Sequence, residues 1–225
     1  MLQSSSLSRI LFPAVIAILG WFALITQFYI NITSGLAGTT ELIIRYFSYF
    51  TILTNLLVAV CCTCIVIIPR KGAGAFFSRP RTLTAITVYI LIVGIIYNVI
   101  LRFLWQPEGI QKLVDELLHS VIPVLFLVYW WFAPDKRNVQ WKHIFSWLIY
   151  PLIYLIYILI RGNFSGFYPY PFVNVDQIGI TKVILNSIGI TLAFTITGVI
   201  LITAGKWQYR RQTSASAGTI KYTKP

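Results

Sequence analysis

Apolar residues fill six long runs of the chain, and polar or charged residues gather in the short segments between them. A helix needs about 20 mostly apolar residues to cross the hydrocarbon core of a bilayer. The pattern therefore predicts six membrane-spanning helices, near residues 10–29, 46–68, 83–104, 114–133, 143–161 and 181–204. We expect an all-α transmembrane bundle over residues 1–205, followed by a basic tail at 206–225. The tail has no periodic apolar face and is predicted to be disordered and cytoplasmic.

The first apolar run follows Arg9, as the core of a cleaved signal peptide would. Bulky side chains such as Trp21, Phe22 and Tyr29 occupy the place of the small residues that a cleavage site requires. We therefore interpret the first run as a retained helix.

Composition supports a membrane protein over a soluble one. Of the 225 residues, 57% are hydrophobic and 11% are charged, whereas soluble domains carry about 25% charged residues. The net charge of +12 would suit a nucleic-acid ligand. The charges lie in short loops between apolar runs, however, which is how membrane topology is encoded, so we expect no nucleic-acid partner.

The loop charges predict the orientation of the bundle. One side holds 13 of the 18 Lys and Arg residues: Arg9, Arg70, Lys71, Arg79, Arg81, Lys136, Arg137, Lys142, Lys206, Arg210, Arg211, Lys221 and Lys224. The other side holds Arg45, Arg102, Lys112, Arg161 and Lys182. Cytoplasmic loops carry the excess of Lys and Arg. We therefore predict a multi-pass protein of the cell membrane with both termini in the cytoplasm.

Metal and cofactor motifs are missing from the sequence. Cys61, Cys62 and Cys64 cluster without a nearby histidine, whereas a zinc site needs about four ligands. We interpret these cysteines as small apolar residues of the helix interior, and we expect no metal and no cofactor.

The second run carries hydroxyl and amide side chains at helical spacing. Ser48, Thr51 and Asn55 are three and four residues apart, which puts them on one face of a helix. Small hydroxyl residues also hold membrane helices together by packing and hydrogen bonding. We consider Thr51 a candidate nucleophile, and Ser48 and Asn55 candidate substrate-binding residues.

The fourth run begins with ionisable residues that are costly to place in a membrane. Asp115 and His119 are four residues apart and can meet on one face, where the carboxylate would orient the imidazole. Pro123 has no N–H, so the carbonyl of His119 loses its helical partner and the helix is liable to kink. Asp115 and Glu116 also fit an ordinary first helical turn, where acidic residues favour the helix dipole. We consider His119 and Asp115 candidate catalytic residues and Glu116 a candidate binding residue.

Two arginines end the third and fifth runs. Arg102 follows Asn98 by one turn, and Arg161 leads into a loop that contains Tyr168 and Tyr170. Arginines at a membrane boundary usually reach to lipid headgroups, and they also bind carboxylates or phosphates in a forked geometry. We include all five residues among the candidate substrate-binding residues.

The candidate nucleophile and base fall at similar depths. Thr51 lies six residues beyond Arg45, and His119 lies four residues beyond Asp115, which at 1.5 Å per residue is about 9 Å and about 6 Å of helix. Both should lie in the outer leaflet, close to the interface. A hydroxyl and an imidazole that share a pocket there would suit nucleophilic attack on a lipid ester.

Four segments resemble a bacterial six-span membrane family of unknown function. They are Gly20-Trp21-Phe22-Ala23-Leu24, Tyr46-Phe47-Ser48-Tyr49-Phe50-Thr51-Ile52-Leu53-Thr54-Asn55, Asp115-Glu116-Leu117-Leu118-His119 and Tyr168-Pro169-Tyr170-Pro171-Phe172. The resemblance extends to about residue 205 and implies the six-span fold, but no activity.

A more distant resemblance is to the eukaryotic androgen-induced membrane hydrolases, which cleave fatty acid esters of hydroxy fatty acids with one Thr and one His. The matching stretches are Phe50-Thr51-Ile52-Leu53, His119-Ser120-Val121-Ile122-Pro123 and Tyr170-Pro171-Phe172. The resemblance implies Thr51 as nucleophile and His119 as base. The nucleophile stretch of that family continues with an Asp where this chain has Thr54, so the sequence leaves Thr51 and Thr54 both open, with spacing in favour of Thr51.

Three functions remain open on the sequence. The first is a hydrolase of membrane lipid or fatty acid esters, and the second is a protein that binds or transports a lipid or small molecule through an outward-facing polar cavity. The third is a scaffold whose polar groups only stabilise helix packing. We expect membrane lipids and a lipophilic ester or lipid substrate as partners, and the sequence does not indicate an oligomeric state.

Overall fold

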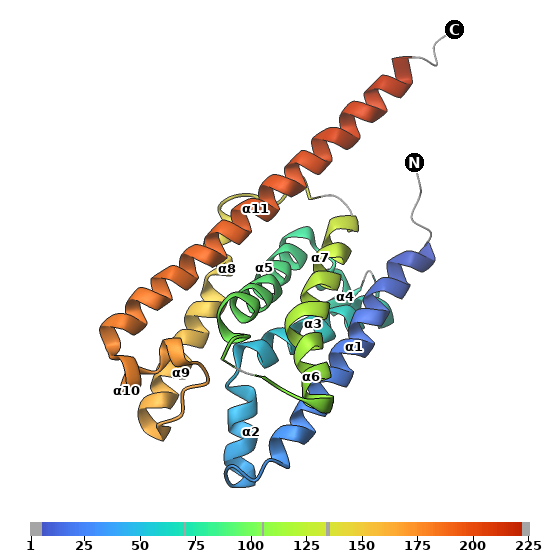
Figure 1. Ribbon diagram of the computed structural model, residues 1–225. Helices are drawn as coiled ribbons and strands as arrows, with labels where there is room; N and C mark the ends of the chain where they lie inside the picture. Colours follow the sequence, from blue (N-terminus) through green and yellow to red (C-terminus); the bar gives the residue numbers. More distant parts are fainter. Residues whose placement is uncertain (1–5, 70, 105, 134–135, 222–225) are drawn as a thin grey trace.

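The computed structural model describes residues 6–69, 71–104, 106–133 and 136–221, and the side chains of residues 10–211 within these ranges. All regular elements in this part of the chain are helical (Figure 1). They are α1 (Ser6–Ile32), α2 (Thr39–Phe47), α3 (Phe50–Ile67), α4 (Gly72–Phe77), α5 (Pro80–Ile96), η1 (Tyr97–Leu101), α6 (Gly109–Glu116), η2 (Leu117–Val121), α7 (Ile122–Phe132), α8 (His143–Trp147), α9 (Ile149–Ser165), η3 (Pro171–Val173), α10 (Val175–Ile178) and α11 (Ile180–Lys221).

Six stretches of the described chain are long and apolar enough to cross a membrane, which confirms the predicted all-α bundle of six spans. They are Ile10–Ile32, Phe50–Ile67, Pro80–Phe103, Gly109–Phe132, His143–Ser165 and Ile180–Arg211. The start of α1 and the end of α11 lie at the same end of the bundle (Figure 1). We call the opposite end, where α2 and α10 lie, the distal end.

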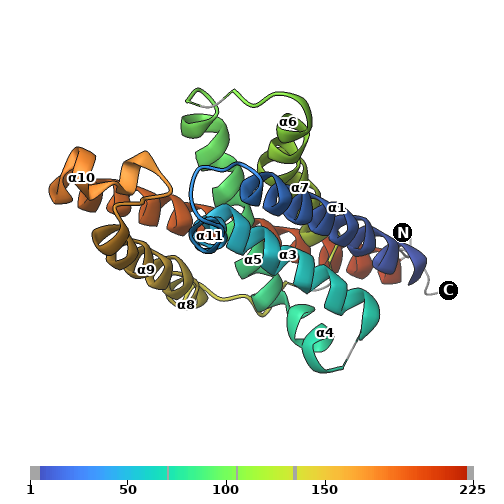
Figure 2. The same ribbon diagram turned by 90° about the horizontal axis from the view of Figure 1, so that it is seen from below.

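Helix α5 forms the centre of the bundle, with α3, α7 and α11 packed around it and α1 packed along α3 (Figures 1 and 2). Residues on all sides of α5 are buried, among them Ile86, Val88 and Ile90. Burial covers 56% of the apolar windows of α3 and of α5, but 17% of the window that contains α8 and α9. Helix α9 is therefore a peripheral helix that leaves most of its apolar surface to lipid.

The predicted span near residues 46–68 is confirmed over Phe50–Ile67, but its first residues belong to a separate helix, α2. Helix α2 ends at Phe47, Tyr49 is extended (φ −84°, ψ 126°), and α3 begins at Phe50. The hydroxyl of Ser48 donates to the carbonyl of Ile44 at 2.7 Å, which satisfies the end of α2. The break removes Ser48 from the face that carries Thr51 and gives α3 an N-terminus of its own inside the bundle.

Two spans contain a π-helical turn, and the two turns pack against each other. They are η1, which continues α5, and η2, which joins α6 to α7. Short π-helical turns inside α-helices are frequent at functional sites. The turn in η2 ends shortly before Pro123, in the region where the sequence predicts a kink. The carbonyl of His119 accepts a hydrogen bond from the side-chain amide of Asn98 at 3.2 Å.

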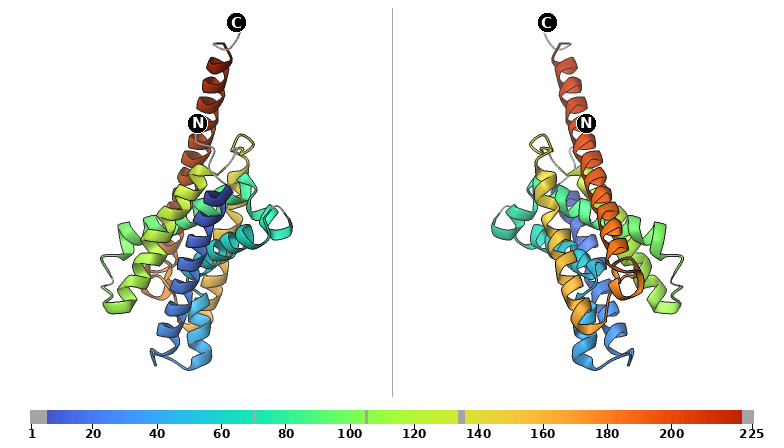
Figure 3. Two further views of the ribbon diagram at one scale, coloured as in Figure 1. Left: turned by 90° about the vertical axis from the view of Figure 1, so that its right-hand side faces the viewer. Right: turned by 90° about the vertical axis from the view of Figure 1, so that its left-hand side faces the viewer.

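Helix α11 extends beyond the other helices (Figure 3). It continues to Lys221, through most of the tail that the sequence predicts to be disordered, because each further helical residue adds one backbone hydrogen bond. Residues 222–225 of that tail, which include Lys224, lie outside the described part, as does Arg70.

Gly162 of α9 lets the distal loop pack closely against the helix. A Cβ atom on this buried glycine would lie 2.0 Å from Cε1 of Tyr168. We expect Gly162→Ala to lower the free energy of unfolding by about 1–3 kcal/mol through overpacking, although alanine favours a helix by about 1 kcal/mol over glycine. Thermal unfolding of the detergent-solubilised protein measures this difference.

Gly189 of α11 provides the matched control, because a Cβ there meets no atom within 4 Å. Gly189→Ala should leave the melting temperature unchanged or raise it. A Gly162→Ala protein that melts at or above the wild-type temperature would show that stability does not depend on the close contact between Gly162 and Tyr168.

Candidate functional site

A polar cavity of about 350 Å³ opens at the distal end of the bundle. It is lined by Gln27, Asn31, Tyr46, Tyr49, Thr51, Ile52, Tyr97, Leu101, Leu104, Gln111, Asp115, Leu118, His119, Pro169, Tyr170 and Pro171. These residues come from α1, α2, α3, η1, α6, η2, η3 and the loop before η3, with Tyr49 just before α3 and Leu104 after η1. The cavity therefore lies where most of the spans converge.

An apolar cavity of about 300 Å³ adjoins the polar one. It lies between α3, α5, α9 and α11, and its lining is mostly aliphatic and aromatic. Four residues line both cavities: Thr51, Tyr97, Leu101 and Tyr170. The hydroxyl-bearing side chain of Thr51 therefore stands at the junction of a polar and an apolar compartment.

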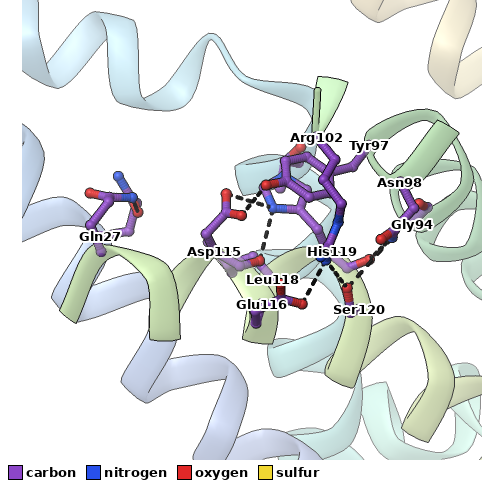
Figure 4. A network of polar contacts seen from close by, with 12 residues as sticks. Gln27, Gly94, Tyr97, Asn98, Arg102, Asp115, Glu116, Leu118, His119 and Ser120 are labelled. Carbon is purple, nitrogen blue, oxygen red and sulfur yellow. Dashed lines mark hydrogen bonds and ion pairs between the residues drawn. The ribbon is translucent and has the colours of Figure 1, made fainter. Parts of the chain in front are cut away.

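His119 is held by two partners on the wall of the polar cavity. Its Nδ1 lies 3.2 Å from Oδ1 of Asp115 and 3.0 Å from the carbonyl oxygen of the same residue. The ring of Tyr97 stacks on the imidazole with 3.9 Å between centroids, and the hydroxyl of Tyr97 donates to the other carboxylate oxygen of Asp115. Figure 4 shows this arrangement. The predicted meeting of Asp115 and His119 is confirmed, and Nε2 remains as the ring nitrogen for proton exchange.

Thr51 is the second residue of α3, and its partner is Tyr170. The Thr51 backbone N–H donates to the Tyr170 hydroxyl at 3.3 Å, and the two hydroxyls lie 3.4 Å apart. Tyr170 thus caps one of the backbone N–H groups that the first turn of a helix leaves free. Burial raises the pKa of Tyr170 to about 12, so this hydroxyl stays protonated at neutral pH. Within the described residues, Thr51 makes no hydrogen bond to His119.

Asn55 joins the helix of Thr51 to the helix of His119. Its amide donates to the carbonyl of Thr51 at 2.9 Å and to the carbonyl of Leu118 at 3.1 Å. Asn55 is fully buried, so these bonds form in a dry interior where an unpaired amide would be costly. The contact brings α3 and η2 together at the depth of the polar cavity.

Asn98, Arg102 and Glu116 form a second group behind His119 (Figure 4). The Asn98 amide donates to backbone carbonyls of Gly94 and His119. Arg102 donates to Glu116 at 2.7 Å and to the Ser120 hydroxyl at 3.1 Å. These bonds hold η1 and the adjoining Arg102 against α6 and η2.

Arg161 takes part in a separate ion-pair cluster at the distal surface. Arg161 Nη2 and Arg45 Nε each lie 2.8 Å from Oε1 of Glu41, and both guanidinium groups lie over the ring of Phe167. Hydrogen bonding to Arg45, with a further contribution from Arg161, holds the pKa of the Glu41 carboxyl below its usual value of 4.5.

The lowered pKa of Glu41 predicts a pH-dependent contribution to stability. Because the folded-state pKa lies below the unfolded value, the ionised carboxylate stabilises the fold above the usual carboxyl pKa and loses this effect as pH falls through the folded value. Glu41→Gln should lower the free energy of unfolding by about 1 kcal/mol or less at neutral pH. The difference from wild type should vanish in acid, as followed by thermal unfolding across pH. Glu108→Gln, at an exposed carboxylate, serves as control.

Four of the predicted site residues line the polar cavity: Thr51, Asp115, His119 and Tyr170. The other predicted residues line neither of the two cavities; they are Ser48, Asn55, Asn98, Arg102, Glu116, Arg161 and Tyr168. Thr54 is also absent from both linings, is fully buried, and lies 3.4 Å from the hydroxyl of Tyr150. The geometry therefore separates Thr51 from Thr54, which the sequence leaves open.

Sequence reasoning missed Tyr97, Gln27 and Gln111. Tyr97 directly precedes Asn98, and its position one residue before a suspected polar residue could have drawn attention to it. Gln27 and Gln111 lie near the ends of two spans and hydrogen-bond to each other at 2.8 Å. Polar residues near span ends are common, so no local pattern distinguishes this pair.

The chain matches no protein-family model, no curated protein and no solved structure. In the part of the chain that the structure describes, no group of three His, Cys, Asp or Glu side chains is placed to hold a metal ion. The chemistry of the site is therefore argued from its own side chains, and the family resemblances of the sequence remain predictions.

Proposed function

We propose that the protein is a membrane-embedded hydrolase of lipid or fatty acid esters, with Thr51 as nucleophile and His119 as general base. The observation that carries the proposal is the position of Thr51, whose hydroxyl-bearing side chain lines both cavities. An ester with an acyl chain in the apolar cavity would have its polar part in the other cavity. Its scissile bond would then lie at the junction, beside Thr51.

The proton transfers use the pair of His119 and Asp115. Thr51 Oγ1 attacks the ester carbonyl carbon while His119 takes the hydroxyl proton and passes it to the departing alkoxide, which leaves an acyl-threonine and a free alcohol. Water then attacks the acyl carbon, His119 takes its proton, and the carboxylic acid leaves with the Thr51 hydroxyl restored. Asp115 holds Nδ1 and favours the protonated imidazole that forms in both steps.

The contact of Thr51 with Tyr170 is one that a bound substrate would replace. A substrate carbonyl at the junction would separate the two hydroxyls and free the Thr51 side chain to turn toward His119. Catalytic hydrogen bonds are often long or absent until substrate is bound. The Tyr170 hydroxyl then faces the carbonyl oxygen as a donor to the developing oxyanion.

Labelling of the purified protein with a fluorophosphonate tests the proposal. The reagent should add to Thr51, as located by peptide mass spectrometry, and Thr51→Ala should abolish the adduct. If the wild-type protein is not labelled, and lipid esters are hydrolysed at the same rate with and without it, the proposed hydrolase activity is wrong.

Lipid binding without bond cleavage is the second candidate. The specific observation in its favour is the hydrogen bond of Thr51 to Tyr170 in place of one to His119. Such a protein would retain a long-chain ester intact after prolonged incubation, as mass spectrometry of the extracted lipid would show.

We further propose that the distal end faces away from the cytoplasm in the cell membrane, with both termini cytoplasmic. The excess of Lys and Arg in the loops of the opposite end supports this orientation. A reporter that is active only in the cytoplasm should be active when it is fused to the C-terminus, and a reporter that is active only after export should not. The opposite result would reverse the assignment.

A further inference from the structure

The charge of the polar cavity points to the class of lipid that it accepts. Among the described residues that line it, Asp115 and His119 are the only acidic or basic side chains. Asp115 is buried, with 6% of its surface exposed. The lining therefore contains one carboxyl group and one imidazole, and no lysine or arginine side chain.

The arginines of the distal end lie outside the lining of the polar cavity. Arg45 and Arg161 share Glu41, and Arg102 pairs with Glu116. None of these arginines lines either cavity. An anionic headgroup in the polar cavity would thus lie beside the Asp115 carboxylate with no lysine or arginine side chain in the lining to bind it, which is unfavourable in a site of low dielectric constant.

The amides of the polar cavity suit a hydroxyl-bearing ligand. Gln111 donates to Gln27 Oε1 at 2.8 Å, and Asn31 donates to the carbonyl of Leu42 at 2.7 Å. Within the described residues, the amide N–H₂ of Gln27 and the side-chain carbonyls of Gln111 and Asn31 have no hydrogen-bond partner. The cavity therefore offers both donors and acceptors, and a hydroxyl group can use both.

The apolar cavity has room for one acyl chain of moderate length. Its volume of about 300 Å³ is at the small end of ligand pockets. Phe50 and Phe194 line it, with 5.9 Å between their ring centroids, and Tyr150 packs against Phe50 in the same aromatic group. The other cavity holds the amides and the Asp115–His119 pair, so we place the acyl chain in the apolar cavity and the polar part of the ligand beside the amides.

We infer that the site takes a neutral single-chain ester of a polyol, of the monoacylglycerol type, with its hydroxyls among the amides and its chain in the apolar cavity. This inference rests on the proposed function, in that Thr51 would cleave the ester at the junction. It goes beyond that function by excluding lipids with a phosphate or a free carboxylate in the polar cavity.

Binding of matched ligands that contain no ester bond tests the inference. The full chain in nanodiscs is titrated with 1-O-dodecylglycerol, dodecyl phosphate and dodecanoate, and Phe194→Trp, which fills the apolar cavity, measures partition into the lipid. Dodecylglycerol should bind about tenfold or more tightly than either anion. An anion that binds as tightly as the glycerol ether would overturn the inference.

Charge removal provides the second arm. Asp115→Asn should reduce the preference for dodecylglycerol over dodecyl phosphate by about tenfold or more, because the carboxylate that repels the phosphate is gone. Asp176→Asn removes an exposed carboxylate outside both cavities and should leave the preference unchanged. Equal effects of the two variants would overturn the inference.

Should Asp115→Asn fail to fold, the double variant Gln27→Leu with Gln111→Leu replaces it. That variant should bind dodecylglycerol no more tightly than 1-dodecanol, whereas retained discrimination would contradict the role of the amides. The ether cannot be hydrolysed, so its binding does not depend on catalysis. If the protein prefers the ether but turns over no ester, the proposed hydrolase is wrong and the inferred ligand class stands. If the protein hydrolyses charged esters as fast as neutral ones, the hydrolase stands and the inferred ligand class is wrong.

Discussion

Thr51→Ala should reduce kcat/KM for a monoacyl ester by about 10⁴-fold or more, because removal of a nucleophile eliminates the covalent route. The fold should survive the change. Thr51 loses a single long side-chain contact to Tyr170, and such hydrogen bonds contribute about 1 kcal/mol net. Turnover of the purified protein in nanodiscs, measured beside its melting temperature, gives both quantities.

Thr54→Ala is the matched control for this prediction. Thr54 lies in the same helix, is fully buried and faces Tyr150, away from both cavities. Its removal should change kcat/KM by a few-fold at most, and Thr51→Ser should recover part of the lost rate, because serine restores a hydroxyl. Equal losses in the two alanine variants would mean that the hydroxyl of Thr51 has no chemical role.

The six spans could be predicted because their cause is local. A run of apolar residues long enough to cross a bilayer must satisfy its backbone groups internally, and a helix does this within one segment. The break between α2 and α3 could not be predicted in the same way, since the apolar run continues through Ser48 and Tyr49. The break is stabilised by tertiary structure, because the hydroxyl of Tyr170, more than a hundred residues away, accepts a hydrogen bond from the Thr51 N–H that the first turn of α3 leaves free.

The contacts of the candidate site likewise differ in whether they could be predicted from the sequence. Asp115 and His119 are four residues apart, so their contact follows from helical geometry and was predictable. The stacking of Tyr97 on His119 joins two spans and depends on two packed π-helical turns, which no sequence spacing reveals.

The arginines and the apolar cavity illustrate two further limits of sequence reasoning. The sequence suggested Arg102 and Arg161 for substrate binding, but it gave no sign of the ion pairs that they form with Glu116 and Glu41. The apolar cavity is lined by the same residue types that fill any helix interface, so a void among them leaves no trace in the hydrophobic pattern. Both features depend on how the spans pack, which the order of residues in one span does not encode.

His119→Ala should reduce kcat/KM for the same ester by about 10²–10⁴-fold, the usual contribution of a general acid–base. The other histidine of the chain, His143, lies in α8 at the end of the bundle opposite the polar cavity, so His143→Ala should leave turnover unchanged. Both variants are compared at equal protein concentration with melting temperature as the check on folding, because His119→Ala also removes the stacking partner of Tyr97.

Combining the two substitutions distinguishes a catalytic unit from two separate structural effects. If His119 acts by removing the proton of Thr51, its loss has little further consequence once the hydroxyl is gone, and the double variant should be about as slow as Thr51→Ala alone. Residues that acted independently would instead give losses that multiply. A double variant slower than Thr51→Ala by the full factor of His119→Ala would show that the imidazole supports turnover by some route that does not pass through the threonine.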